Sequence, residues 1–308
     1  MPKNIPIRHH YIPKFMLRPF ADEEGYLQYY DINTQKIVKK LPEEIFVVSH
    51  LYRDEINSPY DPVIIEKELA RYEGEVAPII RKFRDDADVT LTIEENEKLK
   101  LFLAIMAFRS QRVKEKFGKN ASERNKTFYG IYQEDGNLTD FWTRNLGQIV
   151  KCRSIKEVLD NPNIDDPMKM FMFRDTFGYE GMYFMVLERR GAEEFIVSDC
   201  YPLVMEGEAD NGFKMQMYMI YPISQMKAIL FVYNGVEAAR MSVSGFDRKF
   251  FQKPKYNRES KTIKIASRKI YEEDVKKFNQ IFIDNSEIGI VIQNRKTIEK
   301  HGREIKNC

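Results

Sequence analysis

The spacing of apolar residues changes twice along this chain of 308 residues. Near its start, residues 25–31 and 36–39 have the composition of two strands, and Asn33–Thr34 between them offers a turn. From about residue 62 to 177, apolar residues recur at steps of three and four, which is the period of a helix. Short apolar runs return after Gly178. Elements grouped in this way predict an α+β fold, with a mixed or antiparallel sheet and a helical middle section.

Two apolar stripes define the helices of the middle section. The first stripe contains Pro78, which we expect to kink or interrupt its helix. The second stripe predicts one continuous helix over residues 93–117. The stripes consist of Leu69, Tyr72, Val76, Ile79 and Phe83, and of Leu99, Leu103, Met106, Ser110, Val113 and Phe117.

The last third of the chain reads as strands, with one helix over residues 272–283. No linker rich in glycine, serine or proline divides the chain, so we predict one interwoven domain over residues 1–293. Residues 294–308 form a basic, polar tail that we expect to fray or to dock loosely. The predicted strands cover residues 182–187, 195–197, 203–205, 214–220, 228–233, 262–265 and 288–292.

Composition excludes several classes of protein. The formal net charge is only +2, so binding to a polyanion would need a local basic patch. Three cysteines without a CxxC pair argue against a disulfide framework and against a structural zinc site. The sequence shows no signal peptide and no apolar stretch of membrane-spanning length, so we expect a cytoplasmic protein without membrane contact. Phosphate-binding loops of the GxxxxGK[ST] and GxGxxG types are absent as well.

Adjacent histidines near the start are the first candidates for chemistry. Imidazole titrates near neutral pH, so His9 and His10 could serve as acid, base or metal ligand. Neighbours on a strand point to opposite faces, so one ring would face inward and the other outward. The structural alternative, a packed or surface histidine that ties down a loop, stays open. His50 and His301 read as structural or exposed.

Cations follow the second apolar stripe. Arg109, Arg112 and Lys116 lie at helical spacing, so a continuous helix would place them on one face, with Gln111 beside them. Such a face can hold a phosphate or a carboxylate, and arginine binds these groups with two parallel hydrogen bonds. A solvated helix face that complements the helix dipole is the alternative.

Two carboxylates complete the set of candidates. Ser198–Asp199 follows the predicted strand 195–197, and the end of a strand is a common place for a catalytic or metal-binding group. The alternative for Asp199 is a turn in which its side chain bonds to the backbone. Glu73 lies one step from the first apolar stripe and alone would be an ordinary surface acid.

A basic segment over residues 248–277 interleaves lysines and arginines with Phe250, Phe251 and Tyr256. Cations mixed with aromatic rings are typical of grooves that bind single-stranded nucleic acid, so RNA or single-stranded DNA is the candidate partner. A solvated loop in a charge-rich protein is the alternative.

The chain resembles a largely bacterial family known as domain of unknown function 4238. The resemblance covers most of the chain and implies no established chemistry. It does select His10, Glu73, Arg112 and Asp199 among the candidates. It rests on residues 9–20 (His-His-Tyr-Ile-Pro-Lys-Phe-Met-Leu-Arg-Pro-Phe), 30–36, 51–52, 72–73, 108–112, 195–202 and 221–224, with one extra residue before Pro202.

These residues predict a phosphodiester hydrolase, most simply a nuclease used as a toxin or defence effector. Its catalytic candidates are an imidazole, two carboxylates and a guanidinium, which could bind Mg²⁺, exchange protons and hold a phosphate. A non-enzymatic binding module and a small-molecule transferase are the alternatives. The primary candidates are His10, Glu73, Arg112 and Asp199, and the secondary ones are His9, Arg109, Gln111 and Ser198.

Overall fold

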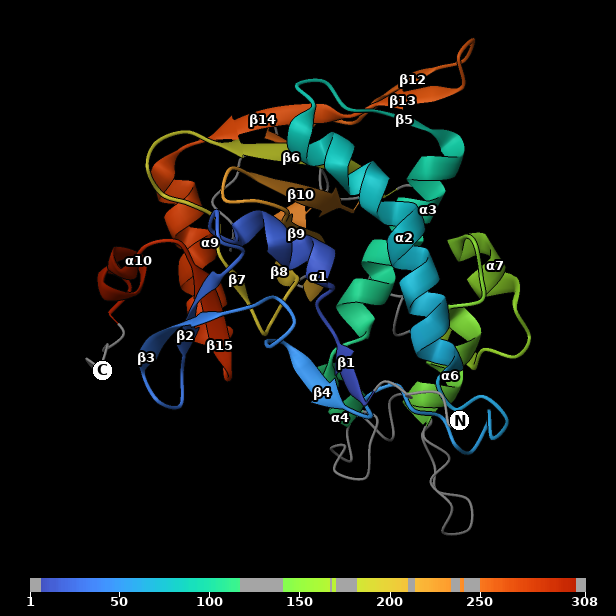
Figure 1. Ribbon diagram of the computed structural model, residues 1–308. Helices are drawn as coiled ribbons and strands as arrows, with labels where there is room; N and C mark the ends of the chain where they lie inside the picture. Colours follow the sequence, from blue (N-terminus) through green and yellow to red (C-terminus); the bar gives the residue numbers. More distant parts are fainter. Residues whose placement is uncertain are drawn as a thin grey trace. The chain divides into compact units, whose positions relative to one another are not determined.

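A computed structural model describes residues 7–116, 141–166, 168–169, 182–209, 214–233, 239–240 and 250–302. The fold is α+β, as predicted, with helices gathered in the middle of the chain (Figure 1). The chain divides into two compact units, each built from several segments. Unit 1 comprises Met1–Tyr11, Val47–Ile79 and Glu94–Phe177, and unit 2 comprises Ile12–Phe46, Ile80–Ile93 and Gly178–Cys308. The prediction of one domain over residues 1–293 stays a prediction.

Unit 1 combines a short strand pair with helices. The two strands are antiparallel, and His9 lies opposite Val48. None of the helices in the described part of the chain combines the length and the apolar character that a bilayer crossing requires. The elements are β1 (Arg8–His10), β4 (Val47–Ser49), α2 (Ile64–Asp85, which continues into unit 2), α3 (Ile93–Phe108), α4 (Gln111–Lys116), α6 (Phe141–Ile149) and α7 (Ile155–Asp160).

Helix α2 runs through Pro78 without interruption, so the expected interruption at this proline is wrong, while the expected kink stays a prediction. Pro78 and Gly74 both lie on the exposed face of the helix. The carbonyl of Gly74, which loses its partner because proline has no N–H, can therefore bond to water. Val76 and Phe83 are fully buried, and this apolar face holds the helix together across the missing bond.

The predicted helix over residues 93–117 is two helices, because α3 ends at Phe108 and α4 begins at Gln111. At the break between the two helices, backbone carbonyl groups are contacted by side chains from other segments of unit 1. Trp142 Nε1 donates to the carbonyl of Phe108 at 3.1 Å, and the Tyr52 hydroxyl lies 3.1 Å from the carbonyl of Arg109. Ser110 then caps α4 by accepting from the backbone N–H of Val113 at 3.3 Å. The break turns Arg109 into the interior and leaves Arg112 exposed, so these cations do not share one helix face.

A six-stranded mixed sheet forms the centre of unit 2. Its order is β11-β8-β9-β10-β6-β14; β14 is parallel to β6, and the other neighbours are antiparallel. Alternate side chains of β6, such as Met185 and Leu187, join a core that includes Phe278 and Phe282 of helix α9. The strands are β6 (Tyr183–Arg189), β8 (Leu203–Ala209), β9 (Lys214–Pro222), β10 (Lys227–Val232), β11 (Ala239–Arg240) and β14 (Ala266–Ile270), and α9 is Glu272–Asn285.

Two smaller sheets complete unit 2. The first has the order β3-β2-β15-β7, and it contains the predicted early hairpin, in which Tyr30 lies opposite Ile37. The second has the order β12-β13-β5. The remaining elements are α1 (Lys14–Leu17), a 3₁₀ turn (Arg18–Phe20), β2 (Leu27–Asp31), β3 (Lys36–Lys40), β5 (Thr90–Thr92), β7 (Val197–Ser198), β12 (Lys255–Asn257), β13 (Thr262–Lys264), β15 (Gly289–Ile292) and α10 (Arg295–Lys300).

The expected loose tail is ordered through residue 302, because residues 295–300 form α10 with Asn294 as its cap. Ile298 is fully buried in the core of unit 2. Glu193, 3% exposed, lies 3.4 Å from Lys300 Nζ and 3.9 Å from His301 Nε2, and it accepts from Asn279 of α9 at 3.2 Å. A buried carboxylate therefore fastens this part of the tail.

We expect His301 to contribute to the acid sensitivity of unit 2. Burial lowers the pKa of His301 below its usual value of 6.5, although Glu193 opposes the shift. Between about pH 6.5 and the lower folded pKa, the unfolded chain binds more protons at this residue, so stability falls as pH falls. Replacing His301 by glutamine should flatten the pH dependence of the free energy of unfolding in this window. Urea titrations of both proteins from pH 7.5 to 5 measure it, and equal slopes would contradict the assignment.

Candidate functional site

The guanidinium of Arg109 joins three segments of unit 1. Its side chain is only 2% exposed. Nε donates to the Tyr52 hydroxyl at 3.0 Å, one terminal nitrogen donates to Glu73 Oε1 at 2.8 Å, and the other donates to the carbonyl of His10. Tyr52 follows β4, Glu73 lies on α2 and His10 ends β1. We call these residues, together with His9, the Arg109 network.

Burial and charge set the protonation states in the Arg109 network. Burial raises the pKa of Tyr52 to about 12, so its hydroxyl is a neutral donor and acceptor at physiological pH. For Arg109, burial alone would lower the pKa, but Tyr52 and Glu73 more than compensate and raise it. The guanidinium therefore stays charged, and its charge is balanced by Glu73, whose side chain is 24% exposed.

His9 fixes Tyr52 from the other side. The fully buried imidazole accepts from the backbone N–H of Tyr52 at Nδ1, over 2.9 Å, and its Nε2 lies 2.7 Å from Glu66 Oε2. Because Nδ1 is an acceptor, the ring proton is on Nε2, and the Glu66 carboxylate lies close to that nitrogen without an aligned hydrogen bond. The ring also stacks on Tyr52, which in turn stacks on Trp142. Of the two histidines, His9 is therefore the packed one.

The structure brings together four of the predicted residues in the Arg109 network, namely His9, His10, Glu73 and Arg109, and places Arg112 and Gln111 outside it. His10, Glu73 and Arg109 meet in unit 1, where His10 contributes its carbonyl and a half-buried side chain. Arg112 is exposed on α4, beyond the helix break. Gln111 is exposed too and donates to Glu115 of the same helix at 2.8 Å.

Asp199 and Ser198 belong to unit 2, and the side chains of both make contacts within that unit. The Asp199 carboxylate accepts from three consecutive backbone N–H groups, those of Glu287, Ile288 and Gly289, at 3.0–3.1 Å. The Ser198 hydroxyl lies 3.0 Å from Cys200 Sγ. Asp199 thereby joins the strand end of β7 to the turn before β15, which is a structural role, although the partners are remote in sequence and not those of the local turn raised as its alternative.

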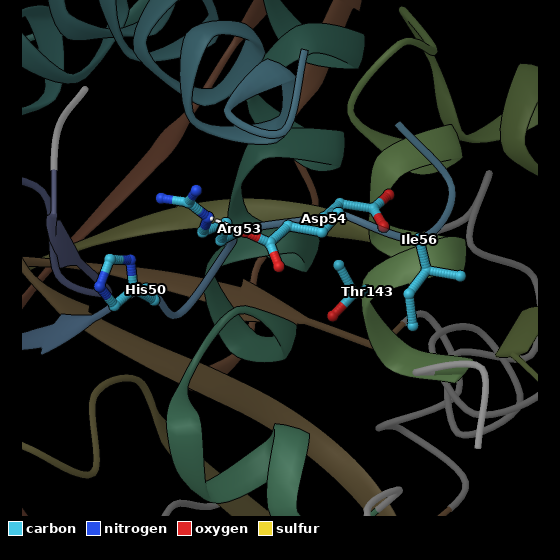
Figure 2. Close-up of a pocket in the computed structure, with 6 residues that line it drawn as sticks. His50, Arg53, Asp54, Ile56 and Thr143 are labelled. Atoms are coloured by element: carbon cyan, nitrogen blue, oxygen red, sulfur yellow. Dashed lines mark hydrogen bonds and ion pairs between the residues drawn. The ribbon is translucent and has the colours of Figure 1, made fainter. Parts of the chain in front are cut away.

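A pocket of about 590 Å³ opens beside the segment that Tyr52 anchors (Figure 2). We call residues 50–57 loop 50–57. In Figure 2, His50 lies at one end of the pocket, whereas Ile56 and Thr143 of α6 lie toward the other end. The lining residues are His50, Arg53, Asp54, Glu55, Ile56 and Thr143.

Loop 50–57 is held in place at several points. Tyr52 is bound by His9 and Arg109, and Lys114 of α4 donates to the carbonyl of Leu51 at 2.9 Å. The backbone N–H of Asp54 donates to the carbonyl of Pro62 at 2.9 Å. The Arg109 network therefore supports the backbone between His50 and Asp54, and those two residues present their side chains to the pocket.

Sequence reasoning missed the residues of this pocket. His50 was expected to be structural or exposed; it is exposed, and it also lines the pocket. Arg53 and Asp54 were not selected, because ordinary polar residues in a loop carry no periodic signal. The run Ser-His-Leu-Tyr-Arg-Asp-Glu at 49–55, placed directly after a strand, was the available hint. Among the described residues, no group of three histidine, cysteine or acidic side chains is arranged to hold a metal ion.

The basic segment over residues 248–277 contains the hairpin β12–β13 of unit 2, and Arg248 and Lys249 lie outside the described residues. In Figure 1 the hairpin is a narrow ribbon with a loop at its tip. Tyr256 is 54% exposed there, and Lys264 lies 3.0 Å from Asp88. The exposed cations in and beside the hairpin are Lys253, Lys255, Arg258, Lys261 and Lys264.

Comparison with known proteins gives one result. No curated protein and no solved structure matches the chain. A family model described as protein of unknown function, DUF4238, matches residues 8–297, which includes the Arg109 network, loop 50–57 and the basic hairpin. This match spans nearly the whole chain and agrees with the resemblance seen in its motifs. The chain therefore belongs to the DUF4238 family.

Proposed function

We propose that this protein binds single-stranded RNA or DNA through the β12–β13 hairpin and hydrolyses its phosphodiester bonds. The observation that carries the proposal is the cationic hairpin with Tyr256 exposed among its lysines and arginines. Phosphates along a single strand would pair with the cations, and a base would stack on the tyrosine ring. Binding through such contacts should not depend on base sequence, because every base has a face that can stack on an aromatic ring.

Hydrolysis is assigned to Glu73 and His10 of the Arg109 network. Arg109 holds Glu73 Oε1, while Oε2 makes no hydrogen bond to the described residues and the side chain is 24% exposed. A fixed carboxylate with one available oxygen suits the role of a base that takes the proton of the attacking water. The water oxygen bonds to phosphorus, one ester P–O bond breaks, and the leaving oxygen takes a proton, for which His10 is the candidate donor.

Non-enzymatic binding is the second candidate, and a specific observation favours it. Arg109 uses all three of its donor nitrogens inside the protein, and Asp199 accepts three backbone N–H groups. Side chains engaged in this way have a sufficient structural role. In that case the hairpin would still bind nucleic acid, but no bond would be cleaved.

The hairpin is tested by reversing three of its charges. We expect Lys255→Glu, Arg258→Glu and Lys261→Glu together to weaken binding of fluorescent RNA and single-stranded DNA. Each lost phosphate contact removes about 0.7 from the slope of log K against log salt, so the slope should fall by about 2. The matched control reverses Lys151, Arg153 and Lys296, which are exposed elsewhere. If the control weakens binding equally, the effect is one of net charge and the hairpin is not the binding surface.

The same substrates, incubated with Mg²⁺ or Mn²⁺, test hydrolysis. Glu73→Gln keeps a carbonyl oxygen for Arg109 but removes its counter-charge, so a urea titration first measures how much stability the variant keeps. Where the variant is folded, it should lose at least 100-fold in cleavage rate because the amide is no base. Binding to the hairpin should be unchanged. If the unaltered protein cleaves neither RNA nor single-stranded DNA, hydrolysis is wrong and the binding function alone remains.

A further inference from the structure

Asp54 is a buried carboxylate with one unused oxygen at the pocket beside loop 50–57. The residue is 4% exposed. Its Oδ1 accepts from both the backbone N–H and the side-chain amide of Asn57, each at 2.9 Å. Its Oδ2 accepts no hydrogen bond from the part of the chain that the structure describes. Asp54 lines the pocket and its Oδ2 is not enclosed by protein atoms, so a ligand with an N–H or O–H group can donate to it.

There is room for such a group beside Oδ2. Gly147 of α6 lies close to this oxygen, because a Cβ added to this glycine would lie 3.8 Å from Asp54 Oδ2. Because glycine has no side chain, the space that a larger residue would occupy stays available next to the oxygen. The same Cβ would lie 3.6 Å from Ile65, which is an ordinary contact distance.

The pocket also offers positive charge. Arg53 donates from Nε to Glu55 Oε1 at 2.7 Å, and its two terminal nitrogens make no hydrogen bond to the described residues. Those nitrogens form the planar pair that binds a phosphate with two hydrogen bonds. The exposed imidazole of His50 lines the pocket as well. Glu55 also lines the pocket and is paired with Arg53 Nε, so an anionic group would be held locally, by the two terminal nitrogens of Arg53.

An apolar surface lies near the carboxylate. Ile56 is 62% exposed and lines the pocket, and Figure 2 shows it on the side away from His50. A flat ring could pack on this side chain. The volume of about 590 Å³ lies within the roughly 300–1,000 Å³ that is usual for sites of small ligands.

We propose that this pocket binds a nucleoside phosphate. The phosphate contacts Arg53 and His50, a sugar hydroxyl or base amino group donates to Asp54 Oδ2, and the base packs on Ile56. A metal cation alone would leave Arg53 and His50 without a role, and inorganic phosphate, whose own hydroxyl could donate to Asp54, would leave the exposed Ile56 without one. The ligand is either a free mononucleotide or the terminal nucleotide of a strand, since both present the same groups. The pocket belongs to unit 1, and the inference does not depend on the hairpin or on hydrolysis.

Calorimetric titration of the full chain tests the proposal. The probes are adenosine and uridine monophosphates, adenosine, ribose 5-phosphate, inorganic phosphate and a short oligonucleotide with a terminal phosphate. We expect the monophosphates to bind at least tenfold more tightly than adenosine or inorganic phosphate. Equal binding of inorganic phosphate would indicate a plain anion site and overturn the proposal. The oligonucleotide is titrated into the hairpin variant with three reversed charges, so that only the pocket contributes to binding. If the oligonucleotide binds more tightly than the monophosphates, the ligand is the terminal nucleotide of a strand. If it binds more weakly, the ligand is a free mononucleotide.

Variants assign the contacts. Asp54→Asn should weaken adenosine monophosphate at least tenfold and leave inorganic phosphate unchanged, whereas Arg53→Gln should weaken both. Asp61→Asn and Arg153→Gln, which change the same residue types outside the pocket, serve as matched controls and should have no effect. If each pocket variant behaves like its control, the proposal is wrong.

Gly147→Ala tests the same contact without changing Asp54, so it remains informative if Asp54→Asn does not fold. The added methyl group meets Ile65 and Asp54 only at ordinary contact distances, and alanine is the better helix former, so the protein should melt no lower than the original. The methyl group occupies the space next to Oδ2, and nucleotide affinity should fall at least threefold. Unchanged affinity in this well-folded variant would contradict a ligand at Oδ2.

Discussion

Replacing Arg109 by methionine should lower the free energy of unfolding of unit 1 by about 3–5 kcal/mol, the cost of removing one partner of a buried charge pair. Methionine has a similar length and fills the space of the alkyl chain. It leaves the Glu73 carboxylate without its counter-charge and removes the donors to the Tyr52 hydroxyl and the His10 carbonyl. Three segments of unit 1 lose their common contact at once.

Trp142 provides the measurement. It is the one tryptophan of the chain, it is fully buried, and it stacks on Tyr52 and Phe108 beside the Arg109 network. Its fluorescence in a urea titration therefore reports on the unfolding of this region. Arg112→Met, at an exposed position three residues away, should change the free energy by no more than about 0.5 kcal/mol. A loss of less than 1 kcal/mol for Arg109→Met would show that the network does not hold unit 1 together.

Replacing Asp199 by alanine should cost unit 2 about 3–4 kcal/mol, because three backbone N–H groups lose a charged acceptor at the same time. Asparagine keeps one acceptor oxygen and should restore roughly half of the loss. Hydrogen exchange at Glu287, Ile288 and Gly289 measures the effect directly, and these amides should exchange much faster in the alanine variant.

This experiment also separates the two interpretations of Asp199. A structural residue loses stability when it is changed to alanine, and any loss of activity follows from unfolding. A catalytic residue at a strand end would lose activity while the exchange of residues 287–289 stayed slow. Ser198→Ala is the matched control in the same strand, since its hydroxyl contacts Cys200 and none of the three amides. Slow exchange in Asp199→Ala would contradict the structural role.

The fold could be predicted where the signal is local. The hairpin β2–β3 and helix α9 follow directly from the spacing of their apolar residues. The helix break at Arg109 could not be predicted, because its causes are the side chains of Tyr52 and Trp142, which are remote in sequence. Pro78 inside α2 is the opposite case: a strong local signal for a break was outweighed by the buried face of the helix.

The candidate site was predictable only in part, for the same reason. Residue type and family motif selected His10, Glu73 and Arg109, and the structure joins them through one guanidinium. The same reasoning placed Asp199 with them, although its carboxylate accepts from the backbone N–H groups of residues 287–289 in unit 2. For Asp54 the polar run at 49–55 was the only hint, because its burial arises from packing between loop 50–57 and α6, which no local pattern records.

Strand β2 is synthesised long before β15, the strand with which it pairs. Tyr30 lies opposite Ile290, which leaves the ribosome 260 residues later. At about 5–20 residues per second, roughly 13–50 s pass before the partner strand exists. During this interval the β2–β3 hairpin is only marginally stable and offers an open edge to other chains. We therefore expect the yield of folded protein to rise when a chaperone protects this edge. It should also rise when the C-terminal half of the chain is synthesised faster.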